Sequence, residues 1–253
     1  MAEAARGFGV DVGGSGIKGG VVDLAAGRLV GDRHRIDTPQ PSTPDAVADV
    51  VAEIVAGFGW EGPVGVTLPA VVKRGVAHTA ANIDKSWIGT DAAALFAKRL
   101  DRRPNEVVVL NDADAAGMAE IRYGWPGDQS GVVVLLTFGT GIGTALFLDG
   151  RLVPNTEFGH LEVDGHDAET RAAASVKDEE ELTWEQWAPR VSRYINALED
   201  LIWPDLIIVG GGVSKKADKW VPMLDVRTKV VAAELRNTAG IVGAATAAAE
   251  REG

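Results

Sequence analysis

Two short glycine-rich turns are the segments of this sequence most able to bind a phosphate chain. Gly14–Ile17 reads G-S-G-I and Gly139–Ile142 reads G-T-G-I, and an apolar run precedes each turn. Backbone N–H groups that converge in such a turn can bind an anion. Asp11, just before the first turn, could hold Mg²⁺, which prefers carboxylate and phosphate oxygens. The alternatives are two ordinary hairpin turns and a solvated aspartate at the end of a strand.

The segment Gly14–Gly19 also fits the pattern G-x-G-x-x-G of dinucleotide-binding folds. In those folds a helix begins directly after the turn, and its N-terminus binds the pyrophosphate. Here a strand-like run continues to Asp23, and the Walker pattern G-x-x-x-x-G-K-[ST] does not occur. We therefore expect each glycine turn to join two strands of a hairpin.

Asp112 is the strongest candidate for acid–base chemistry. It follows the apolar run 107–110 and precedes a helix-compatible stretch that reaches Glu120. An aspartate in that place could cap the helix or act as a general base, and the two roles are compatible.

Glu157 and His160 form a second polar pair, separated by three positions. They could hydrogen-bond a polar substrate or bind a metal as a carboxylate–histidine pair. The sequence has four His and no Cys. Disulfides, zinc–thiolate sites, Fe–S clusters and a catalytic thiol are therefore excluded.

Strands and helices that would position these residues alternate along the chain, which predicts an α/β fold. Thr43 and Pro44 predict the start of a helix, and Thr183 with Gln186 forms a capping box for a helix that stops before Pro204. The strands are expected in the hairpin 9–23 and at 29–36, 64–68, 107–110, 132–138, 144–148 and 206–209. The helices are expected at 44–58, 92–100, 111–120, 183–203 and 230–250, with 165–181 as a polar surface excursion.

The two glycine turns also indicate an internal duplication, since each is followed by an apolar strand and then an aspartate. We predict a small α/β domain over residues 1–110, joined by a C-terminal helix at about 240–253, and a larger α/β domain over 111–239. Gly240 and Gly243 would allow that helix to pack closely.

Composition narrows the class of protein. The chain has 253 residues, 46% of them hydrophobic, and a formal net charge of −11. This balance disfavours nucleic acid and anionic membranes as partners. The N-terminal residues do not read as a signal peptide, and no apolar stretch approaches the ~20 residues of a membrane span. A cytoplasmic location is the expectation.

Several ordered segments resemble the ROK sugar kinases of the actin-like ATPase superfamily. These are 11–18, 111–115, 138–143, 157–160 and 210–214, and the stretches 67–72, 81–89 and 214–220 are more similar to the polyphosphate-using glucokinases of that family. The resemblance implies a ribonuclease-H-like fold with two α/β domains around a cleft. It also implies transfer of a phosphoryl group from polyphosphate, and from ATP, to the 6-hydroxyl of glucose, with Mg²⁺ as cofactor and a homodimer as the assembly.

The resemblance assigns roles residue by residue. Asp112 would be the general base, and Asp11 would hold Mg²⁺ through water. The glucose contacts would be Asn82, Asn111, Asp112, Glu157, His160 and Glu169. The donor-binding residues would be Asp11, Gly13, Gly14, Ser15, Gly16, Lys18, Gly139, Thr140, Gly141, Gly143, Gly210, Gly211, Gly212, Lys215, Lys216 and Lys219. The last three lysines could line a track for polyphosphate or be ordinary solvated surface.

The sequence departs from the wider family in two ways. The cysteine-rich zinc motif of many members is missing between Leu161 and Lys177, so zinc is not expected. No helix-turn-helix segment precedes the first strand, so DNA binding is not expected either. A strictly ATP-dependent hexokinase acting on glucose, mannose or fructose, or a sugar sensor without catalysis, would carry many of the same motifs.

Overall fold

The computed structural model describes residues 5–251. The chain divides into two compact units, of which the first extends to Tyr123 and resumes at Thr238, and the second is Gly124–Asn237. The sequence placed this boundary at residue 110. The difference arises from helix α3 (Asp112–Ala119), which packs on the C-terminal helix α8 (Ala239–Glu250) within the first unit. At their contact, a side chain at Gly243 would place its Cβ 1.8 Å from the Ala115 carbonyl oxygen, so glycine is required there.

The first unit is built on a mixed sheet with the strand order β3-β2-β1-β5-β8, and β4 also pairs with β2. Strands β1, β2, β3 and β4 are joined by antiparallel pairing, whereas β1, β5 and β8 run parallel. The bounds are β1 Arg6–Val12, β2 Gly16–Asp23, β3 Arg28–Leu29, β4 His34–Asp37, β5 Val64–Leu68 and β8 Val107–Asn111. The expected hairpin 9–23 is therefore confirmed.

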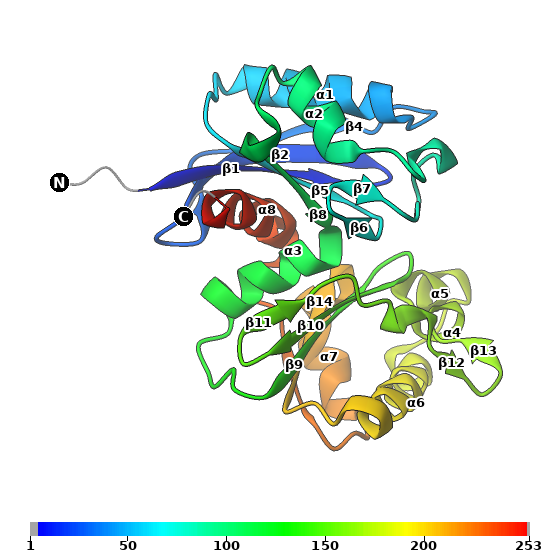
Figure 1. Cartoon of the computed structure of the whole chain (residues 1–253). Helices are drawn as coiled ribbons and strands as arrows, with labels where there is room; N and C mark the ends of the chain where they lie inside the picture. Colours follow the sequence, from blue (N-terminus) through cyan, green and yellow to red (C-terminus); the bar gives the residue numbers. More distant parts are fainter. Residues whose placement is uncertain (1–4, 252–253) are drawn as a thin grey trace. The chain divides into compact units, whose positions relative to one another are not determined.

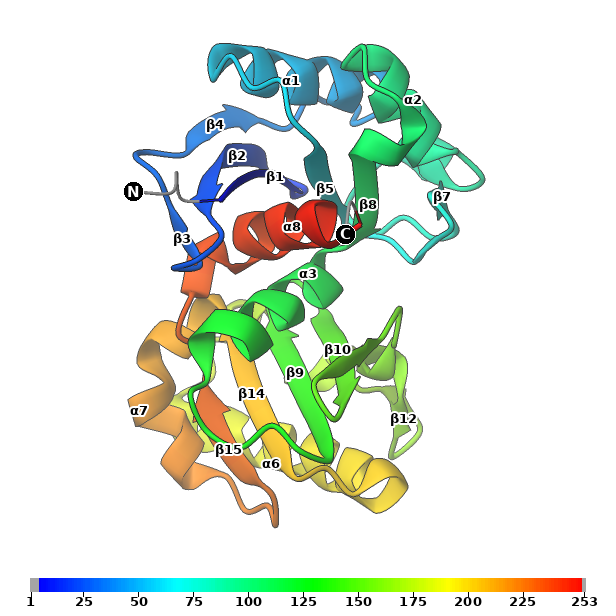
Figure 2. The same ribbon diagram turned by 60° about the vertical axis from the view of Figure 1, so that its left-hand side comes forward.

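Helices cover both faces of this sheet (Figures 1 and 2), with α1 and α2 on one side and α8 on the other. Helix α1 (Pro44–Gly57) begins after Thr43, whose extended backbone and the following proline suit a helix start. Its buried face consists of Val47, Ala48, Val51, Ile54 and Val55. Helix α2 (Ala92–Arg99) is capped by Asp91, which accepts a hydrogen bond from the Ala94 N–H.

The second unit has a sheet of the same kind, in the order β11-β10-β9-β14-β15. Here β9, β10 and β11 pair antiparallel, and β9, β14 and β15 run parallel. The bounds are β9 Val132–Phe138, β10 Ile142–Leu148, β11 Arg151–Val153, β14 Leu206–Gly211 and β15 Lys229–Ala232. Because the two strand orders correspond one to one, the structure supports the internal duplication.

Helix α6 (Trp184–Ile202) packs with α7 (Ala217–Trp220) in the second unit. The predicted capping box is present, since the Gln186 side chain accepts a hydrogen bond from the Thr183 N–H. The core here is aromatic: the Trp187 ring lies 5.7 Å from Phe138 and 5.0 Å from Trp220, both edge to face. Such pairs contribute about 0.5–1.5 kcal/mol each beyond their buried area.

Three expectations about secondary structure are wrong. The single extended segment expected at 29–36 is two short strands, β3 and β4, with residues 30–33 outside both. Residues 229–232 form strand β15 rather than part of a helix, because β-branched valines pair with β14. Segment 165–181 is not a pure surface excursion, since its α4 (Glu169–Ala172) and α5 (Ala174–Glu179) place Ala172, Ala173 and Ala174 in the core.

Short elements complete the described residues. The remaining strands are β6 Val72–Lys73, β7 Val76–Ala77, β12 Glu162–Val163 and β13 His166–Asp167. One-turn helical segments occur at Lys85–Trp87, Pro104–Glu106, Glu120–Gly124, Phe158–His160, Gly212–Lys216, Val221–Met223 and Arg236–Thr238. Among residues 5–251, no helix combines the length and apolar character needed to cross a membrane.

Candidate functional site

The first glycine turn lies between paired Val12 and Ile17 and is flanked by two charges. Asp11 and Lys18 face each other across the hairpin, and the Lys18 Nζ lies 3.7 Å from an Asp11 carboxylate oxygen. The other Asp11 oxygen accepts a hydrogen bond of 3.0 Å from the Thr67 hydroxyl on β5. The Asp11 side chain is 22% exposed. This pair therefore offers solvent-accessible charges of both signs beside the turn.

Thr67 lies in the stretch 67–72 named above, but the sequence assigned it no role. It is fully buried, and its hydroxyl accepts a hydrogen bond from the Val12 N–H while donating to Asp11. One hydroxyl thus orients both the carboxylate and the backbone that enters the turn. Only the parallel pairing of β1 with β5, which sets Thr67 opposite Asp11, reveals this role.

Asn82 lies against the first turn, because its backbone carbonyl contacts Gly14. The residue is exposed and has a left-handed backbone with φ 58°. On the other side of the turn, the Arg35 guanidinium donates to the Ser15 carbonyl oxygen at 3.0 Å. The structure therefore places Asn82 beside the donor-binding candidates of the first hairpin.

Asn111 and Asp112 connect the end of β8 to the start of α3. The N-cap is Asn111, whose side-chain oxygen accepts hydrogen bonds from the Ala113 and Asp114 N–H groups at 2.8 and 3.1 Å. The interpretation of Asp112 as the N-cap is therefore wrong by one residue, because the turn of the chain leaves Asn111 extended and Asp112 helical. Asp112 is partly exposed, and one of its oxygens accepts from the Ala113 N–H at 2.9 Å. The positive N-terminal end of α3 favours a negative charge on this carboxylate.

The second glycine turn is shorter than the first. Paired Phe138 and Ile142 enclose three residues, whereas Val12 and Ile17 enclose four. The sequence predicts the same turn in both places, but the structure shows two related turns of different length. Ser175 on α5 holds the second turn, since its N–H and hydroxyl donate to the carbonyl oxygens of Gly139 and Thr140 at 3.0 and 2.7 Å.

Glu169 on α4 also contacts the second turn. Its carboxylate accepts a hydrogen bond of 3.0 Å from the Ile142 N–H. A Cβ at Gly141 would lie 2.3 Å from the same Glu169 oxygen, so residue 141 must be glycine for this contact to form. The structure thus joins a predicted sugar contact to a predicted phosphate turn.

The predicted segment Gly210–Gly212 lies at the same end of the strands of the second sheet as the second glycine turn. Gly210 and Gly211 end β14 and pair with Thr137 and Phe138, directly before the second turn. Lys215, Lys216 and Lys219 follow on the next turn and on α7; all three are exposed, and no described ion pair involves them. The structure therefore places the glycines of both donor segments at one end of the second sheet, and the three lysines follow directly in sequence.

His160 is held by two carboxylates that follow it in sequence. Its Nδ1 lies 2.9 Å from an Asp167 oxygen and 3.8 Å from a Glu169 oxygen. The hydrogen bond with Asp167 raises the pKa of His160, and the charges of Glu169, Asp167 and Glu157 add to this while desolvation opposes it. Asp167 was missed in the sequence because its partner lies across the β12–β13 hairpin.

Glu157 is the second residue of this region whose pKa is shifted. Burial of its carboxyl by surrounding protein raises its pKa, the nearby charge of Glu169 adds to the rise, and His160 opposes it. Although the residue as a whole is solvent-accessible, its carboxyl is partly desolvated. Perturbed carboxyl and imidazole groups held together are typical of functional sites.

His160, Asp167 and Glu169 each offer a ligand atom within 4.8 Å of the others, so within residues 5–251 they form a group that could hold a metal. Their alternative use is to bind several hydroxyl groups of a sugar, since a histidine and two carboxylates supply donors and acceptors in fixed directions. Acidic groups often gather without a metal.

Together, the described residues can bind a polyhydroxyl molecule, bind phosphates at glycine turns and accept a proton at Asp112. The first unit contains Asp11, Lys18, Asn82, Asn111 and Asp112, with the turn Gly13–Gly16. The second unit contains the other candidates, namely Glu157, His160, Glu169, Gly139–Gly143, Gly210–Gly212 and the three lysines.

Comparison with known proteins gives consistent results. A polyphosphate glucokinase of Mycobacterium tuberculosis is 62% identical over 242 residues, which cover 96% of this chain and 91% of that protein. The crystal structure of an inorganic polyphosphate/ATP-glucomannokinase from Arthrobacter sp. strain KM is 51% identical and superimposes with a TM-score of 0.92, covering 98% of this chain and 99% of that one.

A ROK family glucokinase from Streptomyces griseus, solved in complex with glucose and AMPPNP, is 26% identical with a TM-score of 0.79, over 97% of this chain and 100% of that one. These similarities confirm the expected sugar-kinase fold of two α/β units. The model of the ROK family matches residues 7–176. Since the match and the similarities agree, this chain belongs to the ROK family.

Proposed function

We propose that this chain transfers a phosphoryl group from inorganic polyphosphate, and from ATP, to the 6-hydroxyl of glucose, giving glucose 6-phosphate. The observation that carries the proposal is the 62% identity with a polyphosphate glucokinase over 96% of the chain. The candidate residues support it, because each unit offers side chains or glycine turns of the types that such a reaction uses.

Asp112 is the general base of the proposed reaction. Its carboxylate stands at the first residue of α3, and Asn111 fixes the start of that helix by capping it. Phosphoryl transfer passes through a loose transition state, so the base mainly orients the sugar hydroxyl and accepts its proton late. As the bond from the sugar oxygen to phosphorus forms and the bond to the donor's leaving phosphate breaks, the hydroxyl proton passes to the Asp112 carboxylate.

The sugar is bound by Glu157, His160 and Glu169, with Asn82 and Asn111 as further contacts. The raised pKa of His160 favours the protonated ring, which donates hydrogen bonds to sugar oxygens. Glu169 and Glu157 accept hydrogen bonds from hydroxyl groups. A site built this way rejects a ligand that lacks a hydroxyl, because its polar groups would remain unpaired.

The donor phosphates are bound at the two glycine turns and at Gly210–Gly212. Asp11 fits a Mg²⁺ ion held through water, since it supplies one accessible carboxylate and Thr67 fixes its orientation. When bound, the ion would offset the negative charge of the phosphates. Lys18 can contact a phosphate, and Lys215, Lys216 and Lys219 line the track for a longer polyphosphate. The location proposed is the cytoplasm, and the assembly proposed is a homodimer.

The test is glucose 6-phosphate formation with Mg²⁺ and glucose, with nucleotide-free polyphosphate in one reaction and ATP in another. Product from polyphosphate supports the proposal in full. Product from ATP alone would indicate an ATP-dependent hexokinase and overturn the use of polyphosphate. No product from either donor, together with glucose binding in calorimetry, would indicate a sugar sensor and overturn the proposed reaction.

A further inference from the structure

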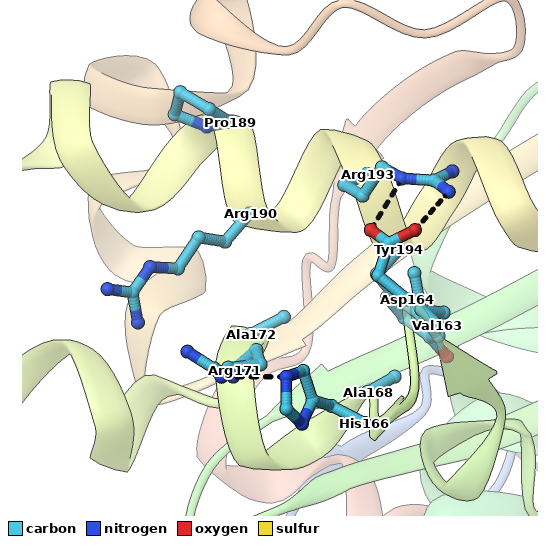
Figure 3. Close-up of a pocket in the computed structure, with 10 residues that line it drawn as sticks. All are labelled: Val163, Asp164, His166, Ala168, Arg171, Ala172, Pro189, Arg190, Arg193 and Tyr194. Atoms are coloured by element: carbon cyan, nitrogen blue, oxygen red, sulfur yellow. Dashed lines mark hydrogen bonds and ion pairs between the residues drawn. The ribbon is translucent and has the colours of Figure 1, made fainter.

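A pocket in the second unit lies between helix α6, helix α4 and the β12–β13 hairpin (Figure 3). Its volume is about 350 Å³. None of the residues assigned above to sugar or donor binding lines it. The pocket is therefore a candidate for a separate ligand.

Positive side chains dominate the polar lining of this pocket. Arg171 comes from α4, and Arg190 and Arg193 come from α6. Two carboxylates offset part of this charge, since Arg193 makes a two-pronged contact with Asp164 at 2.9 and 2.6 Å and Arg190 contacts Glu180 at 2.7 Å. The lining itself therefore carries three guanidinium groups and one carboxylate, that of Asp164, in a protein whose net charge is −11.

Arg171 is the guanidinium of the pocket lining with no carboxylate at ion-pair distance among the described residues, although its charge helps to lower the pKa of Glu180. Among the described residues it forms no ion pair, and its Nη2 donates instead to the His166 Nε2 at 2.9 Å. Because arginine cannot accept a hydrogen bond, the imidazole nitrogen in this contact is an acceptor. The charge of Arg171 is thus available to an anion in the pocket.

Two further polar groups are buried at the pocket and have no hydrogen-bond partner among residues 5–251. They are the Tyr194 hydroxyl, on a residue only 1% exposed, and the Nη1 of Arg190. Burial raises the pKa of Tyr194, so its hydroxyl stays protonated and can donate. A buried polar group without a partner costs about 1–3 kcal/mol, and an acceptor oxygen of a ligand would remove that cost.

Apolar surface completes the lining. Ala168, Ala172 and the Tyr194 ring are buried, and Val163 and Pro189 lie beside them. A ligand that fits this surface has a carbon skeleton as well as an anionic group. Phosphate suits guanidinium groups, which bind its oxygens in a bidentate manner.

We propose that this pocket binds a small organic phosphate, with its phosphate on Arg171 and Arg190 and its carbon skeleton against Ala168, Ala172 and Tyr194. The pocket shares α4 with the sugar-binding candidates, because Arg171 and Ala172 line the pocket while Glu169 contacts the second glycine turn. Likewise His166 lines the pocket, and its neighbour Asp167 holds His160. Ligand binding in the pocket therefore changes the affinity for sugar, because α4 and β13 contribute residues to both places.

The first experiment is isothermal titration calorimetry of the full chain with glucose 6-phosphate as the probe and inorganic phosphate in a parallel titration. We expect Arg171→Gln and Arg190→Gln each to weaken binding at one class of site about tenfold or more, since each removes a charge-assisted hydrogen bond. Tyr194→Phe should weaken it less. The matched control is Arg151→Gln, which changes an exposed arginine on β11 outside the pocket.

The two probes distinguish the sources of the phosphate. Tighter binding of the sugar phosphate supports a role for the apolar lining, and equal binding of both probes would overturn that part of the proposal. Identical binding by wild type, Arg171→Gln and Arg190→Gln would overturn the anion site altogether. Neither readout depends on phosphoryl transfer, so a protein that failed as a kinase could still pass this test.

Hydrogen exchange provides a measurement that needs no variant of the pocket itself. Glucose 6-phosphate should slow amide exchange in segment 187–195 of α6, which holds none of the sugar-binding candidates, and Asp112→Asn should leave that protection intact. Protection confined to segments 11–18, 139–143 and 163–172 would assign all binding to the sugar and phosphate candidates described above and overturn the proposal.

Discussion

The two sheets of this protein have the same strand order but differ in the chemistry at their ends. In both, an antiparallel hairpin begins the sheet and two parallel strands extend it, β5 and β8 in the first unit and β14 and β15 in the second. Asp11 and Lys18 face each other beside the first turn, whereas Thr137 and Gly143 are paired beside the second. A repeated topology thus fixes where functional groups can stand, and residue type decides which unit carries a charge.

The outer parallel strands differ in the same way. Strand β8 leads into Asn111 and Asp112 at the start of α3, whereas β15 ends at Ala232 and is followed by Ala233. The inner parallel strands show the opposite distribution, because β14 ends in glycines that lie beside the second turn. In the proposed function, acid–base chemistry therefore belongs to the first unit and most of the phosphate-binding backbone to the second.

Asp112→Asn gives the largest expected effect. If proton transfer depends on the first unit alone, turnover should fall about 10²–10⁴-fold while glucose still binds. Glucose 6-phosphate formation and glucose titration calorimetry measure the two quantities. The control is Asp91→Asn, because asparagine keeps the N-cap of α2. A variant with a tenth or more of wild-type turnover would remove Asp112 from the mechanism.

Asp11→Asn tests the charge difference between the two turns. The amide oxygen can still accept from Thr67, but it cannot offset a cation, so we expect turnover to fall about 10–10²-fold and the Mg²⁺ requirement to rise. Asp23→Asn, at the other end of the same hairpin, is the control, since Asp23 only accepts from nearby backbone N–H groups. Equal effects from both variants would show that the charge beside the turn has no special role.

The chain entering each outer parallel strand is held by a glutamate, and only one of the two is buried. Glu199 is buried and accepts from the N–H groups of Arg227 and Thr228, at 3.2 and 2.6 Å, before β15. Desolvation raises the pKa of Glu199, but these hydrogen bonds outweigh it and leave the pKa lowered. Before β8, the more accessible Glu106 accepts from the Arg103 side chain and N–H, and its pKa is about 2.

Glu199→Gln should therefore lower the free energy of unfolding by about 1–3 kcal/mol, because an amide N–H₂ would face a backbone N–H. Glu106→Gln should cause a smaller decrease in Tm. Asp200→Asn, which alters the exposed partner of Arg227, is the local control. Thermal and urea unfolding measure all three; an equal loss in Glu199→Gln and Glu106→Gln would contradict the importance of burial.

The lysines after Gly212 test whether charge in the second unit serves the donor. Replacing Lys215, Lys216 and Lys219 by Gln should raise the KM for polyphosphate about three- to tenfold at low salt and reduce its salt dependence. The matched control replaces the exposed lysines 73, 85 and 98 of the first unit. An unchanged KM for polyphosphate in the second-unit variant would show that those lysines are ordinary solvated surface without a role in donor binding.

The smallest effect concerns pH. The pKa of His160 is raised in the folded protein, so its contribution to stability is fully present below about pH 6.5 and is lost as pH rises through the folded pKa. His160→Gln should lower Tm more at pH 6 than at pH 8. His34→Gln, which replaces an exposed histidine of the first unit, is the control for the loss of an imidazole. The effect is small because the His160 side chain is 57% exposed.

Hydrophobic pattern and turn chemistry were enough to predict most elements. Helix α1 followed from Thr43, Pro44 and the spacing of its valines, and α6 followed from Thr183 and Gln186. The strand β15 was missed because three of its four residues are partly buried and sit beside an alanine-rich tail. Short apolar segments of that kind fit a strand or a helix equally well until a partner strand is known.

Site residues were predictable where neighbouring residues of one motif position one another, as at Asn111 and Asp112. The cap itself fell one residue earlier than expected, because the helix boundary depends on a single change of backbone angle. Asp167, Ser175 and Thr67 could not be assigned, since each acts on a residue from another element. Arg171 and Arg190 form one pocket only because α4 lies beside α6.

The sequence by itself determined the local chemistry of this protein: the glycine turns, the absence of thiols, the alternation of strands and helices, and the motifs of the ROK family. Those properties depend on residue type and short spacing, which the chain carries without folding. The tertiary structure alone decided that Thr67 orients Asp11, that Glu169 contacts the second turn and that three arginines gather at one pocket. The physical reason is that such contacts join residues far apart in sequence, whose approach is fixed by sheet register and helix packing rather than by their neighbours.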